Sequence, residues 1–306
     1  MWWLFYALLA HVMNAGVFVV DKSLLATNSK ISSPIKYAAW SGVLAGGAVL
    51  LLPFYWVAPT WAVVNWSLVA GVCWVGALWF SFAALKVGEP SVVVPLTGSV
   101  VPIFTWLIAV VFLGERLSNV TMTAMVLLVL GGAVLSLRLS KAARMNSLVI
   151  GTAALSGMFY AVYFAVVKHV YIVFPFFLPA FAYTRMGVGI AGLALVFWLM
   201  RRPAEKQLVK ERKNGNKLTV YIIGALVISK GFGMMALILQ NYAISLGSVT
   251  VVNALQGTQY LFLLGLAVLV SRYYPRLWKE EYSRVTLTQR LVGMSLVSMG
   301  LVLLVM

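Results

Sequence analysis

Two basic residues, Arg185 and Lys230, stand inside long apolar runs of the chain. A charged side chain at the centre of a bilayer is costly, so such a residue normally faces a partner or a water-filled cavity. Carboxylates that could neutralise the two cations are scarce, because the seven acidic residues lie in polar segments or near predicted helix ends. A phosphate or carboxylate of a ligand would compensate them, with Arg offering a planar fork and Lys a point charge. The two residues therefore predict an anion-binding site.

Uncharged polar side chains recur at helical spacing in other apolar runs. Asn253, Gln256 and Tyr260 stand at positions i, i+3 and i+7, which share one face of a helix. Interhelical hydrogen bonding is one interpretation of such a stripe. We favour the lining of a cavity, because so many polar groups within eight residues exceed the needs of one contact. The full set of predicted substrate-binding residues is Asn14, Thr97, Tyr160, Tyr163, Arg185, Lys230, Asn241, Asn253, Gln256 and Tyr260.

The sequence contains no recognisable set of catalytic residues. Two histidines, His11 and His169, and one cysteine, Cys73, are too few for a zinc site. The chain has neither a glycine-rich nucleotide motif nor a nucleophile paired with a base. His11 is explained as well by packing as by titration. We expect no catalytic residue, metal or cofactor, and any transport would be secondary because no nucleotide-binding domain is present.

The composition is that of a polytopic membrane protein. Apolar residues make up 62% of the 306 residues, charged residues 10%, and the mean hydropathy is +0.97. Runs of about 20 apolar residues, the length that crosses a bilayer, predict ten transmembrane helices. They are 2–20, 34–55, 66–85, 91–113, 119–139, 148–167, 176–200, 218–246, 249–271 and 287–305.

The chain contains an internal duplication. The segment 84–102, with Gly88 and Gly98, returns as 243–259, with Gly247 and Gly257. Two halves of five helices each must enter the membrane from opposite sides, because five is odd, and the repeats are therefore inverted. The predicted fold is an all-α polytopic membrane protein with ten transmembrane helices in two inverted five-helix repeats, 1–145 and 146–306, the second containing the basic loop 201–217.

The net charge of +16 is explained by topology. Nineteen Lys and Arg residues fall in odd-numbered loops, against Arg116 and Lys168 in even-numbered ones. Positive loops are cytoplasmic, which puts both termini outside, in what we expect to be a prokaryotic plasma (inner) membrane. The partners are then a small-molecule substrate and the lipid bilayer, with no nucleic acid. A coupling ion or counter-substrate, and a monomer or a homodimer, remain open alternatives.

Two motifs accompany the pattern of ten helices. Ala84-Leu-Lys-Val-Gly-Glu-Pro-Ser91 leads into the fourth predicted helix, and Phe112-Leu-Gly-Glu-Arg-Leu-Ser118 closes it. On these residues the chain resembles the EamA-type transporters of the drug/metabolite transporter superfamily. The resemblance implies a central cavity between the halves that opens alternately to each side. The predicted function is a secondary carrier for a small polar or anionic metabolite. A flippase for an anionic lipid headgroup and a non-transporting assembly or sensor subunit remain the alternatives.

Overall fold

The computed structural model describes residues 2–27, 33–87, 90–136, 147–201, 220–273 and 284–305. These residues form helices joined by short connections, without a strand among them. The helices are α1 Trp2–Thr27, α2 Pro34–Ala45, η1 Gly46–Phe54, α3 Trp61–Val87, α4 Pro90–Phe112, α5 Asn119–Ser136, α6 Ser147–Val173, α7 Phe177–Met200, α9 Val220–Leu246, α10 Val249–Ala254, α11 Gln256–Tyr273 and α12 Arg284–Val305. The predicted all-α class is thus confirmed for the described residues.

Six helical segments are long and apolar enough to cross a membrane. They are Pro34–Phe54, Trp61–Val87, Ser147–Val173, Phe177–Met200, Val249–Leu266 and Thr288–Val305. Four shorter apolar helices are Trp2–Val17, Leu96–Phe112, Asn119–Leu135 and Gly231–Leu246. Each of the ten runs predicted from the sequence overlaps one of these helices, although within the described residues only the six have the length and hydropathy of a membrane span.

Several predicted helices differ in detail from the observed ones. The first continues to Thr27 rather than ending at residue 20, and the third begins at Trp61 rather than at residue 66. The sixth was expected to end at residue 167, but α6 continues through Lys168 to Val173, because the residues after the lysine are again mostly apolar. The second changes from α-helix to the tighter 3₁₀ form at Gly46, within a Gly-Gly pair of low helix propensity. The ninth is interrupted at Leu255, between α10 and α11, where the Thr258 N–H bonds to the Leu255 carbonyl oxygen three residues back.

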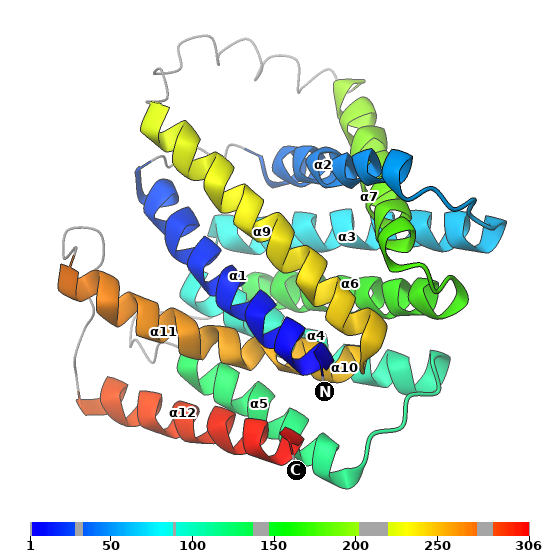
Figure 1. Ribbon diagram of the computed structural model, residues 1–306. Helices are drawn as coiled ribbons and strands as arrows, with labels where there is room; N and C mark the ends of the chain where they lie inside the picture. The colour runs from blue at the N-terminus through cyan, green and yellow to red at the C-terminus, as the bar shows by residue number, and fades with distance from the viewer. Residues whose placement is uncertain are drawn as a thin grey trace.

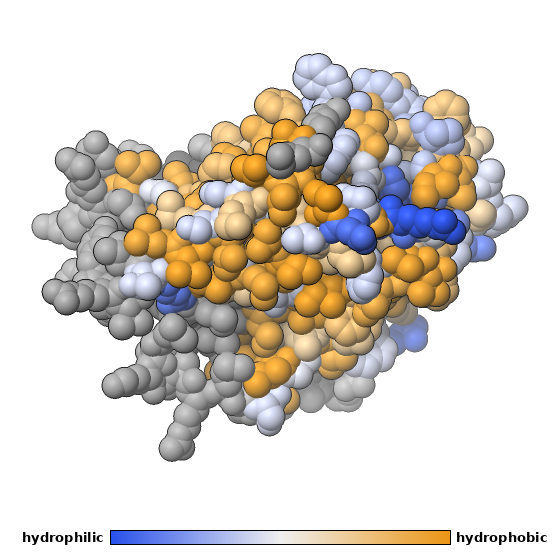
Figure 2. Space-filling model, turned by 90° about the horizontal axis from the view of Figure 1, so that it is seen from below, coloured by the Kyte–Doolittle hydropathy of each residue, from blue (hydrophilic) through white to orange (hydrophobic). Residues whose placement is uncertain are grey.

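The outer surface is covered by large apolar side chains. Trp2, Phe54, Trp61, Val111 and Phe112 are each at least 74% exposed, and the face in Figure 2 is mostly apolar. A soluble monomer rarely exposes so much contiguous apolar surface. Surrounding lipid removes that penalty, which agrees with a membrane location.

Several helices of the first half of the chain pack against helices of the second half. α3 packs against α6 while α1 packs against α9, and α4 packs against α6 while α1 packs against α11. α2 packs against α7, α5 against α12 and α4 against α10. Both termini lie on the same side of the molecule (Figure 1). Every one of these contacts joins residues before 145 to residues after it.

Helix α7 is held unusually close to its neighbours by glycines. A Cβ added to Gly189 would lie 2.8 Å from the Cα of Gly46, and one added to Gly192 would lie 2.6 Å from the backbone nitrogen of Val43. A Cβ on Gly187 would collide with the carbonyl of Ser67 in α3. Small residues permit such close backbone contact between membrane helices. α7 is therefore fixed against α2, η1 and α3 at the level of the residues described next.

Candidate substrate-binding site

Arg185 projects from α7 into its contact with α3 and α6, and its side chain is only 1% exposed. The guanidinium carbon lies 4.8 Å from the ring centre of Trp74, 5.0 Å from that of Tyr163 and 5.6 Å from that of Phe181. All three distances are within the range of about 6 Å for a cation–π contact. Tyr160 is close enough to interact electrostatically with the guanidinium. We call these five residues the Arg185 cluster.

Two side chains of this cluster have hydrogen-bond donors that are unused among the described residues. Among the described residues, Nε, Nη1 and Nη2 of Arg185 have no hydrogen-bond partner. The hydroxyl of Tyr163, a fully buried side chain, has none either. A buried polar group left unsatisfied costs about 1–3 kcal/mol, and more when it is charged. The rings stabilise the positive charge but accept none of its hydrogen bonds, so the cluster can receive an anion without breaking an existing bond.

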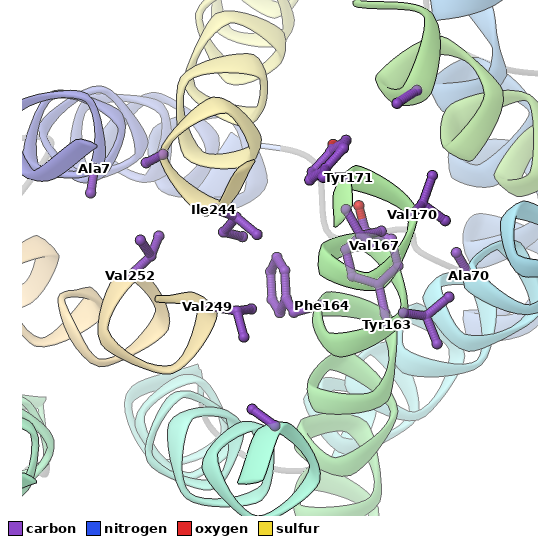
Figure 3. Close-up of a cluster of buried hydrophobic side chains, with 14 of the residues drawn as sticks. Ala7, Ala70, Tyr163, Phe164, Val167, Val170, Tyr171, Ile244, Val249 and Val252 are labelled. Atoms are coloured by element: carbon purple, nitrogen blue, oxygen red, sulfur yellow. The ribbon is translucent and has the colours of Figure 1, made fainter. Parts of the chain in front are cut away.

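Aromatic rings extend from the guanidinium along α6. Trp74 packs edge-on against Tyr160 with ring centres 5.3 Å apart and against Tyr163 at 4.7 Å. Phe164 follows, 6.4 Å from Tyr160 and 5.0 Å from Tyr163. Figure 3 shows Phe164 pointing from α6 toward Ile244 of α9 and Val249 of α10. The three predicted residues Tyr160, Tyr163 and Arg185 are thus brought together.

A second group of predicted residues lies apart from Arg185, where α4 crosses α10 and α11. Tyr260 donates its hydroxyl proton to the Val94 carbonyl at 3.3 Å, and Thr97 donates to the Ala153 carbonyl at 3.3 Å. Asn253 donates from Nδ2 to Oγ1 of Thr105 at 3.2 Å, while its Oδ1 has no partner among the described residues. Most of these groups are therefore used in helix packing.

Gln256 also contributes to this packing. A Cβ placed on Gly98 would meet the Tyr260 hydroxyl and lie 3.1 Å from Nε2 of Gln256. A cavity of about 10 Å³ lies here, bordered by Gly98, Gly257 and Tyr260 among others. This volume is at the lower limit for one water molecule. This cavity, bordered by described residues, is thus too small for a substrate in this conformation.

The remaining predicted residues are scattered. Asn241 in α9 is fully buried, accepts a hydrogen bond from the Tyr171 hydroxyl at 3.0 Å and donates to the Leu237 carbonyl at 2.8 Å. Asn14 is half-buried in α1. Lys230 belongs to α9, but its side chain lies outside the described ones. The structure thus gives Asn241 a packing role and does not place the ammonium group of Lys230.

A second cationic site was not predicted from the sequence. Lys168 in α6 donates from Nζ to the carbonyl oxygens of Ile244 at 2.9 Å, Ser245 at 3.3 Å and Gly247 at 2.8 Å. These carbonyls end α9, where a cation is favourably placed by the helix dipole. Lys168 therefore caps α9 from the side of α6.

Glu115 stands next to this cap, in the connection from α4 to α5. It accepts a hydrogen bond at 2.5 Å from Oγ1 of Thr250, at the start of α10, and interacts electrostatically with Lys168. Gly114 allows the turn through its positive φ of 65°. We call these contacts of Lys168, Glu115 and Thr250 the Lys168 cluster. It joins the two halves of the chain near the termini.

Sequence reasoning missed Trp74 and Phe181 as neighbours of Arg185, and it assigned Lys168 to a loop. Phe181 precedes Arg185 by four residues, and i, i+4 spacing on α7 could have indicated that contact. Trp74 comes from α3 and carries no sequence signal that links it to α7.

Within the described residues, no group of three or more His, Cys, Asp or Glu side chains could hold a metal ion.

The all-helical fold with apolar spans and an apolar exterior defines an integral membrane protein. Residues 1–137 match the EamA-like transporter family, which belongs to the drug/metabolite transporter superfamily. The resemblance that the sequence motifs indicated is thereby confirmed, and it points to a membrane transporter rather than an enzyme. A comparison with curated proteins found no relative of the chain by sequence.

Eighteen chains of solved structures resemble this one in fold. One of them, described as "Crystal structure of protein", superposes with a TM-score of 0.68 at 14% sequence identity. The match covers 98% of this chain and 94% of the other. At this identity the likeness establishes the shared fold alone.

Proposed function

We propose that the protein is a secondary carrier for a small anionic metabolite, working by alternating access between two inverted five-helix repeats, 1–145 and 146–306. The observation that carries the proposal is Arg185, a buried cation whose guanidinium has no hydrogen-bond partner among the described residues. An intramembrane ionisable residue of this kind normally marks a substrate or ion pathway. An anion that enters the bundle would pair with Arg185 and offset its desolvation.

Several of the contacts between the two halves support the inverted repeat. A twofold relation between the repeats would superpose each helix of the first repeat on the helix at the same place in the second, for example α1 on α6 and α3 on α9. It would turn the contact of α1 with α9 into that of α6 with α3, and the contact of α1 with α11 into that of α6 with α4. The same operation maps α2·α7, α5·α12 and α4·α10 onto themselves. These are among the contacts that two interlocked inverted repeats would make.

Alternating access would require the two halves to separate on one side at a time. Near the termini, Glu115 of the first half accepts a hydrogen bond from Thr250 of the second half and interacts electrostatically with Lys168, so the Lys168 cluster joins the halves there. This arrangement fits a carrier closed on that side, with no room yet for its substrate. Opening would expose the Arg185 cluster and allow an anion to reach it.

We place the odd-numbered loops in the cytoplasm and both termini outside, in a prokaryotic inner membrane, from the distribution of Lys and Arg. In a Cys73→Ser background, a cysteine replacing Asn119, which is exposed at the start of α5, should react with an impermeant thiol reagent on intact cells. A cysteine replacing Lys213 should react only after the cells are opened. The reverse labelling pattern would contradict this orientation.

The function is tested by the thermal stability of the purified protein in the presence of anions, because a ligand that binds the native state raises its apparent stability. Phosphate, sulfate, acetate and benzoate are compared with chloride at constant ionic strength. At least one should stabilise the wild type and have no effect on Arg185→Gln.

Arg201→Gln is the matched control for this experiment. Arg201 follows α7 and also contacts a ring, that of Phe197 at 4.2 Å, but it is exposed. It should respond to anions like the wild type. A wild type that responds to no anion, or an Arg185→Gln protein that responds fully, would reject the anion carrier. A non-transporting subunit would then be the better interpretation.

A further inference from the structure

The charge of the Arg185 cluster limits the charge of its ligand. Among the described side chains, Arg185 is the one Lys, Arg, Asp or Glu residue that is buried. Lys168 is only partly buried, and its ammonium group already binds three carbonyl oxygens. One guanidinium balances one negative charge. A dianion such as a phosphate monoester would keep an uncompensated charge among aromatic rings, which is strongly unfavourable.

The geometry of the donors limits the shape of the anionic group. A guanidinium is a planar fork that matches the two oxygens of a carboxylate. All three of its nitrogens are unused, and the buried Tyr163 hydroxyl adds a further unused donor from α6. Together they could satisfy both oxygens of one carboxylate.

The walls of the site limit the rest of the ligand. Trp74, Tyr163 and Phe181 surround the guanidinium, and Tyr160 and Phe164 extend the aromatic surface away from it. Ring faces and edges stack favourably on flat apolar groups. They offer few partners to the hydroxyls of a sugar or polyol, whose burial without hydrogen bonds is costly.

We propose that the substrate is a monocarboxylate with a flat, apolar body, its carboxylate bound by Arg185 and Tyr163 and its body stacked on Trp74, Tyr160 and Phe164. This proposal rests on the carrier function above and narrows its substrate class. Binding requires the helices to part, because these side chains are packed against one another in the present conformation.

The test compares the thermal stabilisation of the purified full chain by six probes at constant ionic strength. They are benzoate, cyclohexanecarboxylate, acetate, benzamide, phenyl phosphate and inorganic phosphate. Benzoate should bind about tenfold more tightly than acetate, because its ring is buried with the carboxylate. Cyclohexanecarboxylate should be weaker than benzoate because it is not flat, and benzamide should give no shift because it has no charge.

Two variants assign the effect to the cluster. Arg185→Lys keeps the charge but loses the fork, and should weaken benzoate about tenfold. Trp74→Leu should weaken benzoate severalfold while leaving acetate unchanged, because only the body of the ligand uses that ring. If either variant fails to fold, the proposal is tested by the order in which the six probes stabilise the wild type.

The outcomes separate the two proposals. Stronger stabilisation by inorganic or phenyl phosphate than by benzoate, lost in Arg185→Gln, would overturn the monocarboxylate and leave the anion carrier standing. Equal binding of acetate and benzoate would overturn the flat body alone. The absence of any anion effect would overturn both, and the aromatic rings would then serve only to hold Arg185 in the fold.

Discussion

Two cationic side chains on consecutive helices differ in their hydrogen bonding. Lys168 of α6 donates to three carbonyl oxygens and lies near Glu115, whereas Arg185 of α7 is more deeply buried and donates to nothing among the described residues. A buried cation that stabilises the fold is expected to have hydrogen-bond acceptors around it. The contrast indicates that Arg185 is kept for a partner that comes and goes, and the following substitutions test whether that distinction is real.

The largest expected effect is the loss of the Lys168 cap. Lys168→Met keeps much of the side-chain volume but leaves the carbonyls of Ile244, Ser245 and Gly247 without their cation. We expect a loss of about 3 kcal/mol in the free energy of unfolding, since hydrogen bonds to charged groups contribute about 1.5–3 kcal/mol. Thermal unfolding measures it.

Lys86→Met is the control for that substitution, because Lys86 is exposed in the last turn of α3. It should change stability little. Equal stability of Lys168→Met and the wild type would mean that water replaces the ammonium group without cost. Lys168 would then not be a stabilising residue, and its contrast with Arg185 would not hold.

The second prediction has the opposite sign. Arg185→Met removes a buried charge that has no hydrogen-bond partner, so without ligand the protein should gain about 1 kcal/mol of stability. The relief of desolvation exceeds the loss of the cation–π contacts, which are worth about 2 kcal/mol when desolvated. Thermal unfolding without added anions measures this gain, and Arg201→Met should be neutral. A destabilised Arg185→Met would identify Arg185 as a structural residue like Lys168.

These two residues also show what the sequence alone could provide. Arg185 could be predicted as a site residue because a charge inside an apolar run can be recognised from the sequence alone. Its aromatic neighbours were not all visible, since Trp74 reaches it only through the packing of α3 on α7. Lys168 was placed in a loop because the predicted helix stopped at the first charge, yet lysine can stay in a helix when carbonyls of another helix receive it.

The polar stripe of the ninth predicted helix illustrates the same limit. Helical spacing put Asn253, Gln256 and Tyr260 on one face, but the helix is interrupted at Leu255, where neither Gly nor Pro marks a break. Only the three-dimensional crossing with α4 shows that Tyr260 bonds to Val94 and that Gln256 lies against Gly98. Ten apolar runs were predictable from composition. The partners of the polar groups were not.

A smaller effect is expected at the edge of the Lys168 cluster. Thr250→Val keeps the shape of the side chain but removes the hydrogen bond to Glu115. Glu115 is half-buried, so water can replace part of the lost bond, and we expect a loss of about 1 kcal/mol. Thr121→Val, at an exposed hydroxyl of α5, is the comparison. A Thr250→Val protein as stable as Thr121→Val would show that Glu115 does not hold the two halves together.

The smallest effect repeats the comparison between two tyrosines of one helix. Tyr163 and Tyr171 are both buried in α6, but the Tyr171 hydroxyl donates to Oδ1 of Asn241 while the Tyr163 hydroxyl has no partner among the described residues. Tyr171→Phe should lose about 1 kcal/mol, because it leaves Asn241 with an unsatisfied oxygen. Tyr163→Phe should gain about 0.5 kcal/mol without ligand, because it removes an unsatisfied buried hydroxyl.

With benzoate present, the order of the two variants should change. Tyr163→Phe should bind benzoate severalfold more weakly than the wild type, because one donor to the carboxylate is missing, whereas Tyr171→Phe should bind it normally. Unfolding temperatures with and without benzoate measure both differences in one titration. If Tyr163→Phe loses stability without ligand as Tyr171→Phe does, its hydroxyl has a partner in the folded protein, and the Arg185 cluster is not a set of donors held for a substrate.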